Sequence, residues 1–403
     1  MSAVGNIAKR WKKLSGIDNW KNLLHPLDID LRRYLIHYGQ MTQATYDTFI
    51  SDRLSGNAGN TRYSMKNMFS RVGLAIANPF KYQVVKYFYA TSTIEVPGSY
   101  IVKSYSRKPW NRESNWFGYV AVATDEGKVA LGRRDIVIAW RGTIMPIEWY
   151  EDFESPLVSA SNIIGTGTNP QVHQGFLSLY TSINPSSPYN KHSARDQVLG
   201  EVDRLMRQYE NEETSLTVTG HSLGAAVATL NALDIVANRH NRKANKEVCP
   251  VTAFVYASPR VGDMRFKMAY DSLENLHLLR IENAPDIVPK VPLVTMGYVE
   301  IGNELLINTQ LSNYLIQPGD IRSWHNLEVY LHGIAGSQGA AGFRLQVNRD
   351  IALLNKEIPS LKRQYGVPGA WLCLRNKGMV QMKDGHWKLH DKERNFDEAE
   401  DSE

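Results

Sequence analysis

A short run of residues near the middle of the 403-residue chain, Gly220-His221-Ser222-Leu223-Gly224, has the types and spacing needed around a nucleophilic serine. A G-x-S-x-G run is common by chance, so its flanks decide its meaning. Here an apolar, strand-like segment precedes it and an alanine-rich, helix-like segment follows it. A sharp strand-to-helix turn would project the serine hydroxyl, and its close neighbours must lack side chains. We therefore predict Ser222 as a nucleophile and Gly220 and Gly224 as the glycines of its turn.

A nucleophilic serine needs a base and an acid that orients the base, and in α/β-hydrolase sites they follow in the order Ser, Asp, His. Asp286, in the run RIENAPDIVPKVP, comes just after a predicted strand over 277–283. Asp263, in SPRVGD, also follows a predicted strand but lies nearer the serine and is more typical of a loop or helix cap. We predict Asp286 as the acid, with Asp263 as the alternative.

Four histidines follow the predicted acid in the chain, namely His325, His332, His386 and His390. His325 precedes a helical pattern, where a loop can reach the ends of the strands, whereas His332 lies two turns later, a spacing typical of a packing residue. The last two fall near the end of the chain. We predict His325 as the base and interpret His173 and His221 as structural.

The negative charge that forms during attack on a carbonyl must be met by preorganised N–H groups. One donor is expected from Leu223, directly after the nucleophile. A second is expected from the run Ala139-Trp140-Arg141-Gly142-Thr143, which ends a predicted strand. Gly142 permits a turn there, and Thr143 offers a backbone N–H and a hydroxyl. An ordinary β-turn is the alternative interpretation of this run.

The elements that must position these residues alternate between strand and helix. Strands are predicted over 117–125 and 135–140, joined by a hairpin at Glu126-Gly127, and again over 215–220, 251–258 and 277–283. Helices are predicted over 27–49, 196–209 and 223–238, and residues 1–100 otherwise read as helix and loop. This alternation is typical of an α/β fold with a mostly parallel sheet flanked by helices.

Composition excludes several classes of protein. The chain is 43% hydrophobic and 22% charged, and no apolar run approaches the ~18 residues of a membrane span. Two distant cysteines, Cys249 and Cys373, indicate neither a disulfide framework nor a metal site. The run GTGTNP lacks the lysine of a phosphate-binding loop, and no nucleic-acid module is visible. We expect no cofactor or metal and, because residues 1–16 do not resemble a secretory signal, a cytoplasmic location.

The net charge of +5 is uneven. Residues 391–403 carry seven acidic residues against two basic ones, a net charge of −5, which leaves +10 on the remaining chain. We expect a disordered acidic tail and a basic body that could favour anionic membrane surfaces.

The motifs together resemble the class-3 lipase family. The runs RGT, VHQGF, GHSLGAA, SPRVGD and APDIVPKVP, followed by His325, occur in the family's order over 117–335. The runs YGQMTQATYDTF, HNLEVYLHG, NKGMV and DGHW extend the resemblance to the plant cytosolic phospholipase A1 group and to nearly the whole chain. One departure is Asn326, where many relatives carry Asp; an Asn can still accept a hydrogen bond at a helix start, so we expect a small effect.

The resemblance implies an α/β-hydrolase fold and a triad of Ser222, Asp286 and His325, with an oxyanion hole at Thr143 and Leu223. It implies cleavage of the sn-1 acyl ester of glycerophospholipids, with galactolipids or acylglycerols as further substrates, and transient association with a lipid surface. It also suggests an amphipathic lid within 144–153, whose apolar side is formed by Ile144, Ile147, Trp149 and Phe153.

The resulting organisation is an N-terminal extension (1–100) packed on a catalytic core (101–335), then a C-terminal elaboration (336–390) and the acidic tail (391–403). Two other functions stay open at this point. One is a carboxylesterase acting on small or feruloyl esters, and the other is a lipase-like signalling scaffold without catalysis. The oligomeric state is left open.

Overall fold

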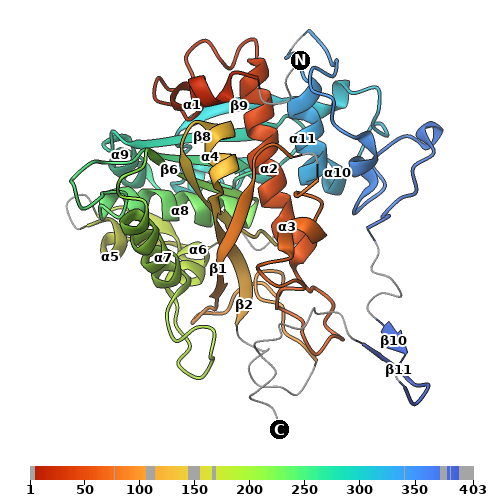
Figure 1. Cartoon of the computed structure of the whole chain (residues 1–403), viewed down its shortest axis with the longest axis horizontal. Helices are drawn as coiled ribbons and strands as arrows, with labels where there is room; N and C mark the ends of the chain where they lie inside the picture. Colours follow the sequence, from red (N-terminus) through yellow and green to blue (C-terminus); the bar gives the residue numbers. More distant parts are fainter. Residues whose placement is uncertain are drawn as a thin grey trace.

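The fold is described from a computed structural model, which covers residues 5–76, 78–105, 114–143, 155–165, 169–339, 341–372, 379–381 and 383–389. Its centre is a seven-stranded sheet with the strand order β1-β2-β3-β6-β7-β8-β9 (Figure 1). The strand bounds are β1 Tyr82–Ala90, β2 Asn115–Ala123, β3 Arg134–Trp140, β6 Thr214–His221, β7 Val251–Tyr256, β8 Leu276–Asn283 and β9 Asn303–Ile307.

The five strands from β3 to β9 run parallel, and antiparallel pairing in this sheet is confined to β1 with β2 and β2 with β3. The carboxyl ends of the parallel strands therefore meet at one edge of the sheet, where α/β proteins place their sites. Helices cover both faces of the sheet. The predicted α/β-hydrolase class, with a mostly parallel sheet flanked by helices, is confirmed.

The connection between β2 and β3 differs from the prediction. The two strands pair antiparallel as expected, but the predicted hairpin turn at Glu126-Gly127 is wrong, because both residues lie in a helix, α4 (Asp125–Leu131). The Thr124 hydroxyl accepts a hydrogen bond from the Gly127 N–H, and Gly132 ends the helix in the left-handed conformation. A cap at each end stabilises this two-turn helix.

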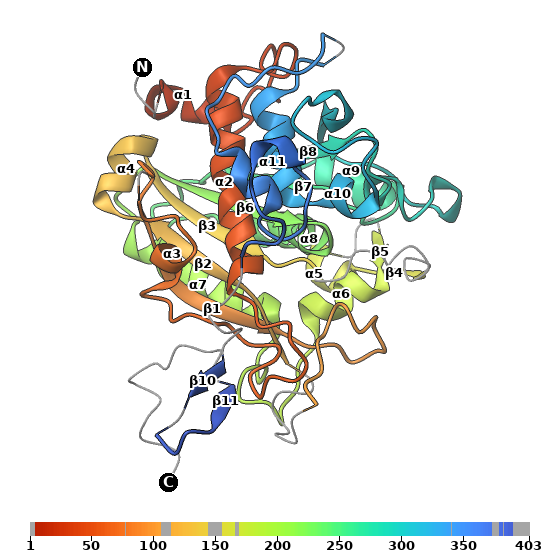
Figure 2. The same cartoon turned by 90° about the vertical axis from the view of Figure 1, so that its right-hand side faces the viewer.

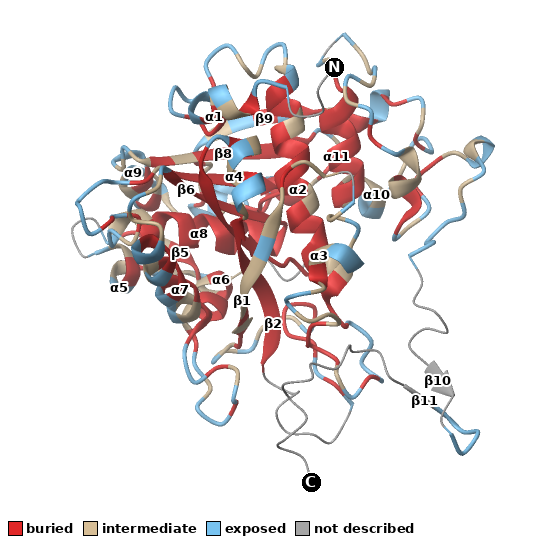
Figure 3. Cartoon of the chain, viewed as in Figure 1, coloured by how far each residue is buried: buried red, intermediate tan, exposed pale blue. Residues whose placement is uncertain are grey.

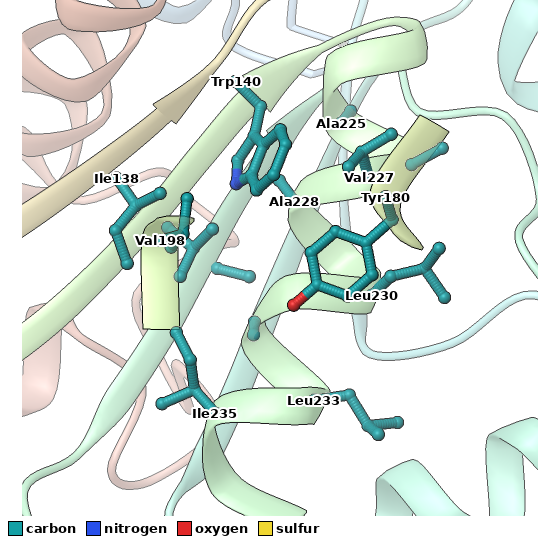
Figure 4. Packing of buried hydrophobic residues seen from close by; sticks show 14 of the residues in the cluster. Ile138, Trp140, Tyr180, Val198, Ala225, Val227, Ala228, Leu230, Leu233 and Ile235 are labelled. Atoms are coloured by element: carbon teal, nitrogen blue, oxygen red, sulfur yellow. The ribbon is translucent and has the colours of Figure 1, made fainter. Parts of the chain in front are cut away.

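One face of the sheet is covered by α6 (Gln174–Thr181), α7 (Ala194–Gln208) and α8 (Leu223–Ala237). Their apolar side chains form one buried cluster with Ile138 and Trp140 of β3 (Figure 4). The alanines of α8 let this helix lie close to the sheet, since a larger residue would hold it away. This cluster fixes the helix that begins at the predicted nucleophile.

The opposite face is covered by α1 (Ile7–Leu14), α2 (Ile29–Thr48) and α11 (Leu327–Gly336), which pack beside one another (Figures 1 and 2). Figure 3 shows α2 and α11 buried along most of their length. The Arg32 guanidinium of α2 donates to the Ile334 and Ser337 carbonyl oxygens at the end of α11. The prediction of a helix over 27–49 is confirmed by α2.

The first hundred residues also contain strand β1, which the prediction of helix and loop missed. Its sequence, YQVVKYFYA, lies at the sheet edge and is mostly half-buried, so it lacks the clean alternation that identifies a strand.

The remaining elements of the described part are short. They are α3 Met68–Arg71, β4 Leu157–Ser159, α5 Ser161–Ile164, β5 Gln171–His173, α9 Met264–Asp271, η3 Val288–Lys290, η4 Val294–Met296, η5 Thr309–Leu311, α10 Ile321–His325, η6 Ile351–Asn355, η7 Arg363–Tyr365, β10 Met379–Gln381 and β11 Trp387–Leu389. Within the described residues, no helix combines the length and apolarity required to cross a bilayer.

Candidate active site

The predicted nucleophile lies in a strained turn between β6 and α8. Ser222 has φ 64° and ψ −128°, a backbone conformation that costs free energy for a residue with a side chain. Its N–H donates to the Tyr256 carbonyl oxygen of the neighbouring strand. A Cβ added to Gly220 would lie 2.2 Å from the Gly224 carbonyl oxygen, and one added to Gly224 would lie 2.4 Å from the Trp140 carbonyl oxygen. Both positions therefore require glycine.

The structure brings Ser222, Asp286 and His325 together in one hydrogen-bonded row. The His325 Nε2 lies 3.0 Å from the Ser222 Oγ, and its Nδ1 lies 2.7 Å from the Asp286 Oδ2. Because an ionised carboxylate only accepts, Nδ1 carries the proton and Nε2 accepts from the serine hydroxyl. All three side chains are buried. This is the arrangement in which a histidine can remove the serine proton.

The base sits between two helices. His325 ends α10, which begins with a capping box at Asp320, and α11 starts two residues after His325. Between the helices, Asn326 turns the chain and its side-chain oxygen accepts from the Val329 N–H at 3.3 Å. Asn326 thus supplies the helix cap that was expected of it despite its departure from Asp.

The acid is held by three donors. One Asp286 oxygen accepts from His325 and from the Tyr330 hydroxyl at 2.6 Å, and the other accepts from the Val288 N–H at 3.0 Å. Tyr330 lies on α11 and is fully buried. Hydrogen bonds to the charged form keep a carboxylate ionised even when it is buried. Tyr330 therefore fixes the orientation of the acid relative to the base.

A second row of hydrogen bonds runs behind the first. The Tyr46 hydroxyl of α2 lies 2.7 Å from the His221 Nδ1, and the His221 Nε2 lies 2.9 Å from the His325 carbonyl oxygen. A carbonyl only accepts, so His221 donates from Nε2 and accepts from Tyr46. Burial holds the pKa of His221 well below its ordinary value, and the ring stays neutral. His221 has the structural place predicted for it.

The loop after β3 lies beside the elbow. Trp140 of β3 is in register with Gly220 of β6. A Cβ on Gly142 would lie 2.0 Å from the Tyr46 hydroxyl oxygen and 2.5 Å from the His221 carbonyl oxygen, so only glycine fits. The Thr143 hydroxyl is buried and has no hydrogen-bond partner within the described part of the chain. A buried hydroxyl in that condition is available to a ligand.

The other predicted backbone donor, Leu223, begins α8 directly after the nucleophile. The first N–H groups of a helix have no partner within the helix, and the helix dipole makes this end positive. Leu223 is thus the residue next to Ser222, and Thr143 follows the carboxyl end of β3, the strand that pairs with β6. The lid residues predicted within 144–153, namely Ile144, Ile147, Trp149 and Phe153, lie outside the described residues.

The alternative residues lie elsewhere. Asp263 caps α9, where its carboxylate accepts from the Phe266 N–H at 2.8 Å and the Gln171 N–H at 3.1 Å. His332 is buried in α11, with its Nε2 2.8 Å from the Ser312 Oγ. His173 caps α6 and stacks on Phe176.

Two further histidines follow late in the chain. His386 is exposed near the end of the chain, and His390 lies outside the described residues. Among the described residues, no group of three or more His, Cys, Asp and Glu side chains could hold a metal ion. The triad itself provides a serine nucleophile with a base and an acid.

Sequence reasoning missed Tyr330, Tyr46 and Arg141 as parts of this site. Tyr330 follows His325 by five residues in a helical pattern, a spacing that could have suggested a contact with the acid loop. Tyr46 lies in a run that contributed to the family resemblance, and Arg141 lies in the run predicted to supply the second oxyanion donor, but neither side chain was given a role. Their contacts join segments far apart in the chain, and no spacing reveals such contacts.

Comparison with known proteins agrees with this geometry. Residues 137–296 match the family model described as Lipase (class 3). Phospholipase A1-II 1 of Oryza sativa subsp. indica is 50% identical over 396 residues, 98% of each chain. Phospholipase A1-IIgamma of Arabidopsis thaliana is 52% identical over 401 residues, 98% of this chain and 95% of that one.

Among solved structures, the Lip2 lipase of Yarrowia lipolytica is 18% identical, with a TM-score of 0.46 over 73% of this chain and 83% of that one. The identity and coverage of the two plant relatives are far above what chance similarity gives. The chain belongs to the class 3 lipase family, in the group of the plant phospholipases A1-II.

Proposed function

We propose that this protein hydrolyses the sn-1 acyl ester of glycerophospholipids through an acyl-enzyme on Ser222. The observation that carries the proposal is the row Ser222–His325–Asp286, at 3.0 Å and 2.7 Å, at the carboxyl edge of the sheet. The choice of a phospholipid is supported by the names of the plant relatives, phospholipases A1-II, which match over nearly their full length. Galactolipids and acylglycerols are further candidate substrates.

The first half of the reaction forms the acyl-enzyme. The Ser222 oxygen attacks the ester carbonyl carbon while His325 takes the hydroxyl proton at Nε2. The resulting imidazolium is stabilised by the Asp286 carboxylate, which Tyr330 and the Val288 N–H hold in place by donating to it. The negative oxygen is met by the Leu223 and Thr143 donors. His325 then protonates the departing lysolipid oxygen as the C–O bond breaks.

The second half releases the fatty acid. Water attacks the acyl carbon and gives its proton to His325 Nε2, and the same donors stabilise the second negative oxygen. His325 returns the proton to Ser222 as the acyl–serine bond breaks, and the fatty acid leaves. Strain at Ser222 is present before substrate arrives, so no reorganisation of the elbow is needed during attack.

The test is product analysis with a phosphatidylcholine that carries different acyl chains at sn-1 and sn-2. The expected products are the sn-1 fatty acid and the 2-acyl lysolipid, and Ser222→Ala should lower the rate ~10⁴–10⁶-fold while the protein stays folded. Release of the sn-2 chain would overturn the regiochemistry. Hydrolysis of short soluble esters alone would favour the carboxylesterase. A wild-type protein with no esterase activity would favour the non-catalytic scaffold.

The proposal also concerns the surface on which the enzyme meets its substrate and the compartment in which it acts. The substrate is part of a bilayer or micelle, so we propose transient contact with a lipid surface, supported by the excess of basic residues over the first 390 residues. Sedimentation with anionic and zwitterionic vesicles would test this contact. The cytoplasmic location stays a prediction from the sequence.

A further inference from the structure

A fully buried arginine lies one residue before the oxyanion loop. Arg141 directly follows β3, and its side chain has no exposed surface. Its guanidinium carbon lies 3.8 Å from the centre of the Phe49 ring and 4.8 Å from that of Phe117. Aromatic faces stabilise a cation in this position and exclude water from it. The charge is therefore held rigidly in a region of low dielectric constant.

Among the described residues, the acceptors of this guanidinium are all backbone carbonyls. Nη1 donates to the Gly142 oxygen at 2.7 Å, Nε to the Trp116 oxygen at 3.1 Å and Nη2 to the Tyr100 oxygen at 3.4 Å. Within the described part of the chain, no carboxylate forms an ion pair with it. Burial lowers the pKa of Arg141 to about 9, so the group stays charged at neutral pH. The site thus contains a positive charge that its described neighbours do not neutralise.

The shortest of these bonds acts on the peptide that forms the oxyanion hole. The Gly142 carbonyl and the Thr143 N–H belong to one planar trans peptide unit, so they point in opposite directions. Holding the carbonyl against Arg141 therefore directs the Thr143 N–H to the other side. It also polarises the peptide and makes that N–H a stronger donor. The Tyr46 hydroxyl also packs against Gly142, so a second side chain restrains the same loop.

A similar buried arginine occurs elsewhere in the protein and has no such role. Arg32 of α2 is also buried and donates only to carbonyls, those of Leu27, Ile334 and Ser337. Two of these carbonyls end α11, where the helix dipole is negative and offsets the charge. Within the described residues, none of the carbonyls that accept from Arg141 ends a helix. The negative charge that would meet its field is the one that forms on the substrate oxygen.

We propose that Arg141 is a positioning residue for catalysis: it orients the Gly142–Thr143 peptide and adds positive potential at the oxyanion hole. The inference rests on the proposed function, because it assumes that an oxyanion forms beside Ser222. It predicts an effect on the transition state that substrate binding does not share. Arg32 provides a matched control, since it has the same kind of bonds in another place.

The experiment compares Arg141→Gln, Arg141→Lys and Arg32→Gln in the full chain. Two quantities are measured, kcat and KM on a short-chain soluble ester, and the affinity for an alkyl trifluoromethyl ketone, which forms a tetrahedral oxyanion with a nucleophilic serine. Thermal unfolding gives the folded fraction, so that kcat refers to folded protein. The ketone affinity reports directly on the oxyanion hole. A loss of packing alone does not change this affinity.

For Arg141→Gln we expect kcat to fall ~10²-fold with KM within about threefold of wild type, and ketone affinity to fall in proportion. Arg141→Lys keeps the charge but cannot hold all three carbonyls, so its losses should be smaller, roughly tenfold. Arg32→Gln should lower thermal stability and leave both readouts unchanged. If Arg141→Gln does not fold, Arg141→Lys decides the matter by the same two readouts.

The proposal is overturned if folded Arg141 variants keep kcat and ketone affinity within about threefold of wild type, or if Arg32→Gln reduces both equally. Equal losses of kcat and ketone affinity in Arg141→Gln and Arg141→Lys would overturn the electrostatic part of the proposal, because the lysine keeps the charge. Failure of the phospholipid assignment is a separate result, because it would appear as intact ester and ketone chemistry in a wild type that leaves phospholipids uncleaved.

Discussion

The two ends of strand β3 each bury an arginine, and the protein treats these two charges differently. At the amino end, Arg133 is fully buried and lies 3.4 Å from the Asp135 carboxylate. It also donates to the hydroxyls of Tyr34 at 2.5 Å and Tyr38 at 2.9 Å. At the carboxyl end, Arg141 has only carbonyl oxygens and aromatic rings around it in the described part of the chain.

The same contrast extends to the groups around each arginine. At the amino end, Asp135 accepts hydrogen bonds from Tyr38, Tyr82, Ser215 and Thr217, so its buried oxygens are fully used. At the carboxyl end, the Thr143 hydroxyl has no partner within the described residues. A complete polar network holds strands together, whereas an incomplete one can receive a ligand. We infer that the amino end of β3 anchors the strand, whereas its carboxyl end contributes to the active site. These are called the anchored end and the chemical end.

The largest expected effect separates two histidines at the chemical end. His325→Ala should lower ester hydrolysis by ~10³ or more at unchanged fold, because the serine loses its base. His332→Ala should lower stability by about 1–3 kcal/mol and leave kcat per folded molecule near wild type, because it removes a buried side chain bonded to Ser312. Steady-state kinetics and urea unfolding of both variants provide the comparison.

A folded but inactive His332→Ala beside an active His325→Ala would reverse the assignment of the base. The same pairing applies to the acids. Asp286→Asn should silence the enzyme, since it no longer holds the imidazolium, whereas Asp263→Asn should only weaken the start of α9.

The next effect concerns the anchored end. Asp135→Asn leaves the buried Arg133 without its charged partner, a change that typically costs about 3–5 kcal/mol of stability. The carboxyl end is unaffected by this loss, so kcat per folded molecule should stay within about twofold of wild type. Urea denaturation at pH 7 measures the first quantity. Steady-state rates, divided by the concentration of active sites from titration with a fluorophosphonate, provide the second.

Asp125→Asn is the matched control, because Asp125 also contacts an arginine, Arg134, but is almost fully exposed. The free energy of unfolding of Asp125→Asn should hardly differ from that of wild type. A large loss of kcat in folded Asp135→Asn would show that the two ends of β3 are not independent.

The sequence predicted the chemical end of this comparison better than the anchored end. Ser222 and its glycines form a local motif. Asp286 follows a strand and His325 precedes a helix, and periodicity reveals both elements. Arg141 and Tyr46 were not predicted because their partners come from β2, β6, the end of α2 and the loop at Tyr100, which no spacing relates. Strand β1 was not predicted because an edge strand is only half-buried. Helix α4 was not predicted because its two cap residues, Thr124 and Gly132, stabilise a helix where a hairpin turn was expected.

The smallest expected effect tests whether the anchored end also limits stability in acid. His37 of α2 lies among the rings of Tyr38, Phe80 and Tyr82, and burial lowers the pKa of His37 to about 3. The nearby Asp135 raises this pKa and Arg133 lowers it, both by less than burial does. In the unfolded chain a histidine has a pKa near 6.5. Between about pH 6.5 and pH 3, His37 therefore binds a proton in the unfolded state but not in the folded state.

The sign follows from this difference. The contribution of neutral His37 to stability is fully present above pH 6.5 and is lost as pH falls, by up to ~1.4 kcal/mol per pH unit. Between pH 7 and pH 5 this amounts to about 2 kcal/mol. His37→Phe should fit among the same rings and lose no bond at Nε2, which has no partner within the described part. Urea unfolding at the two pH values should show a loss about 2 kcal/mol smaller than in wild type, while the exposed His386→Ala should match wild type. An unchanged acid loss in His37→Phe would mean that the histidine opens to solvent without unfolding, and that the anchored end is less rigid than its hydrogen bonds indicate.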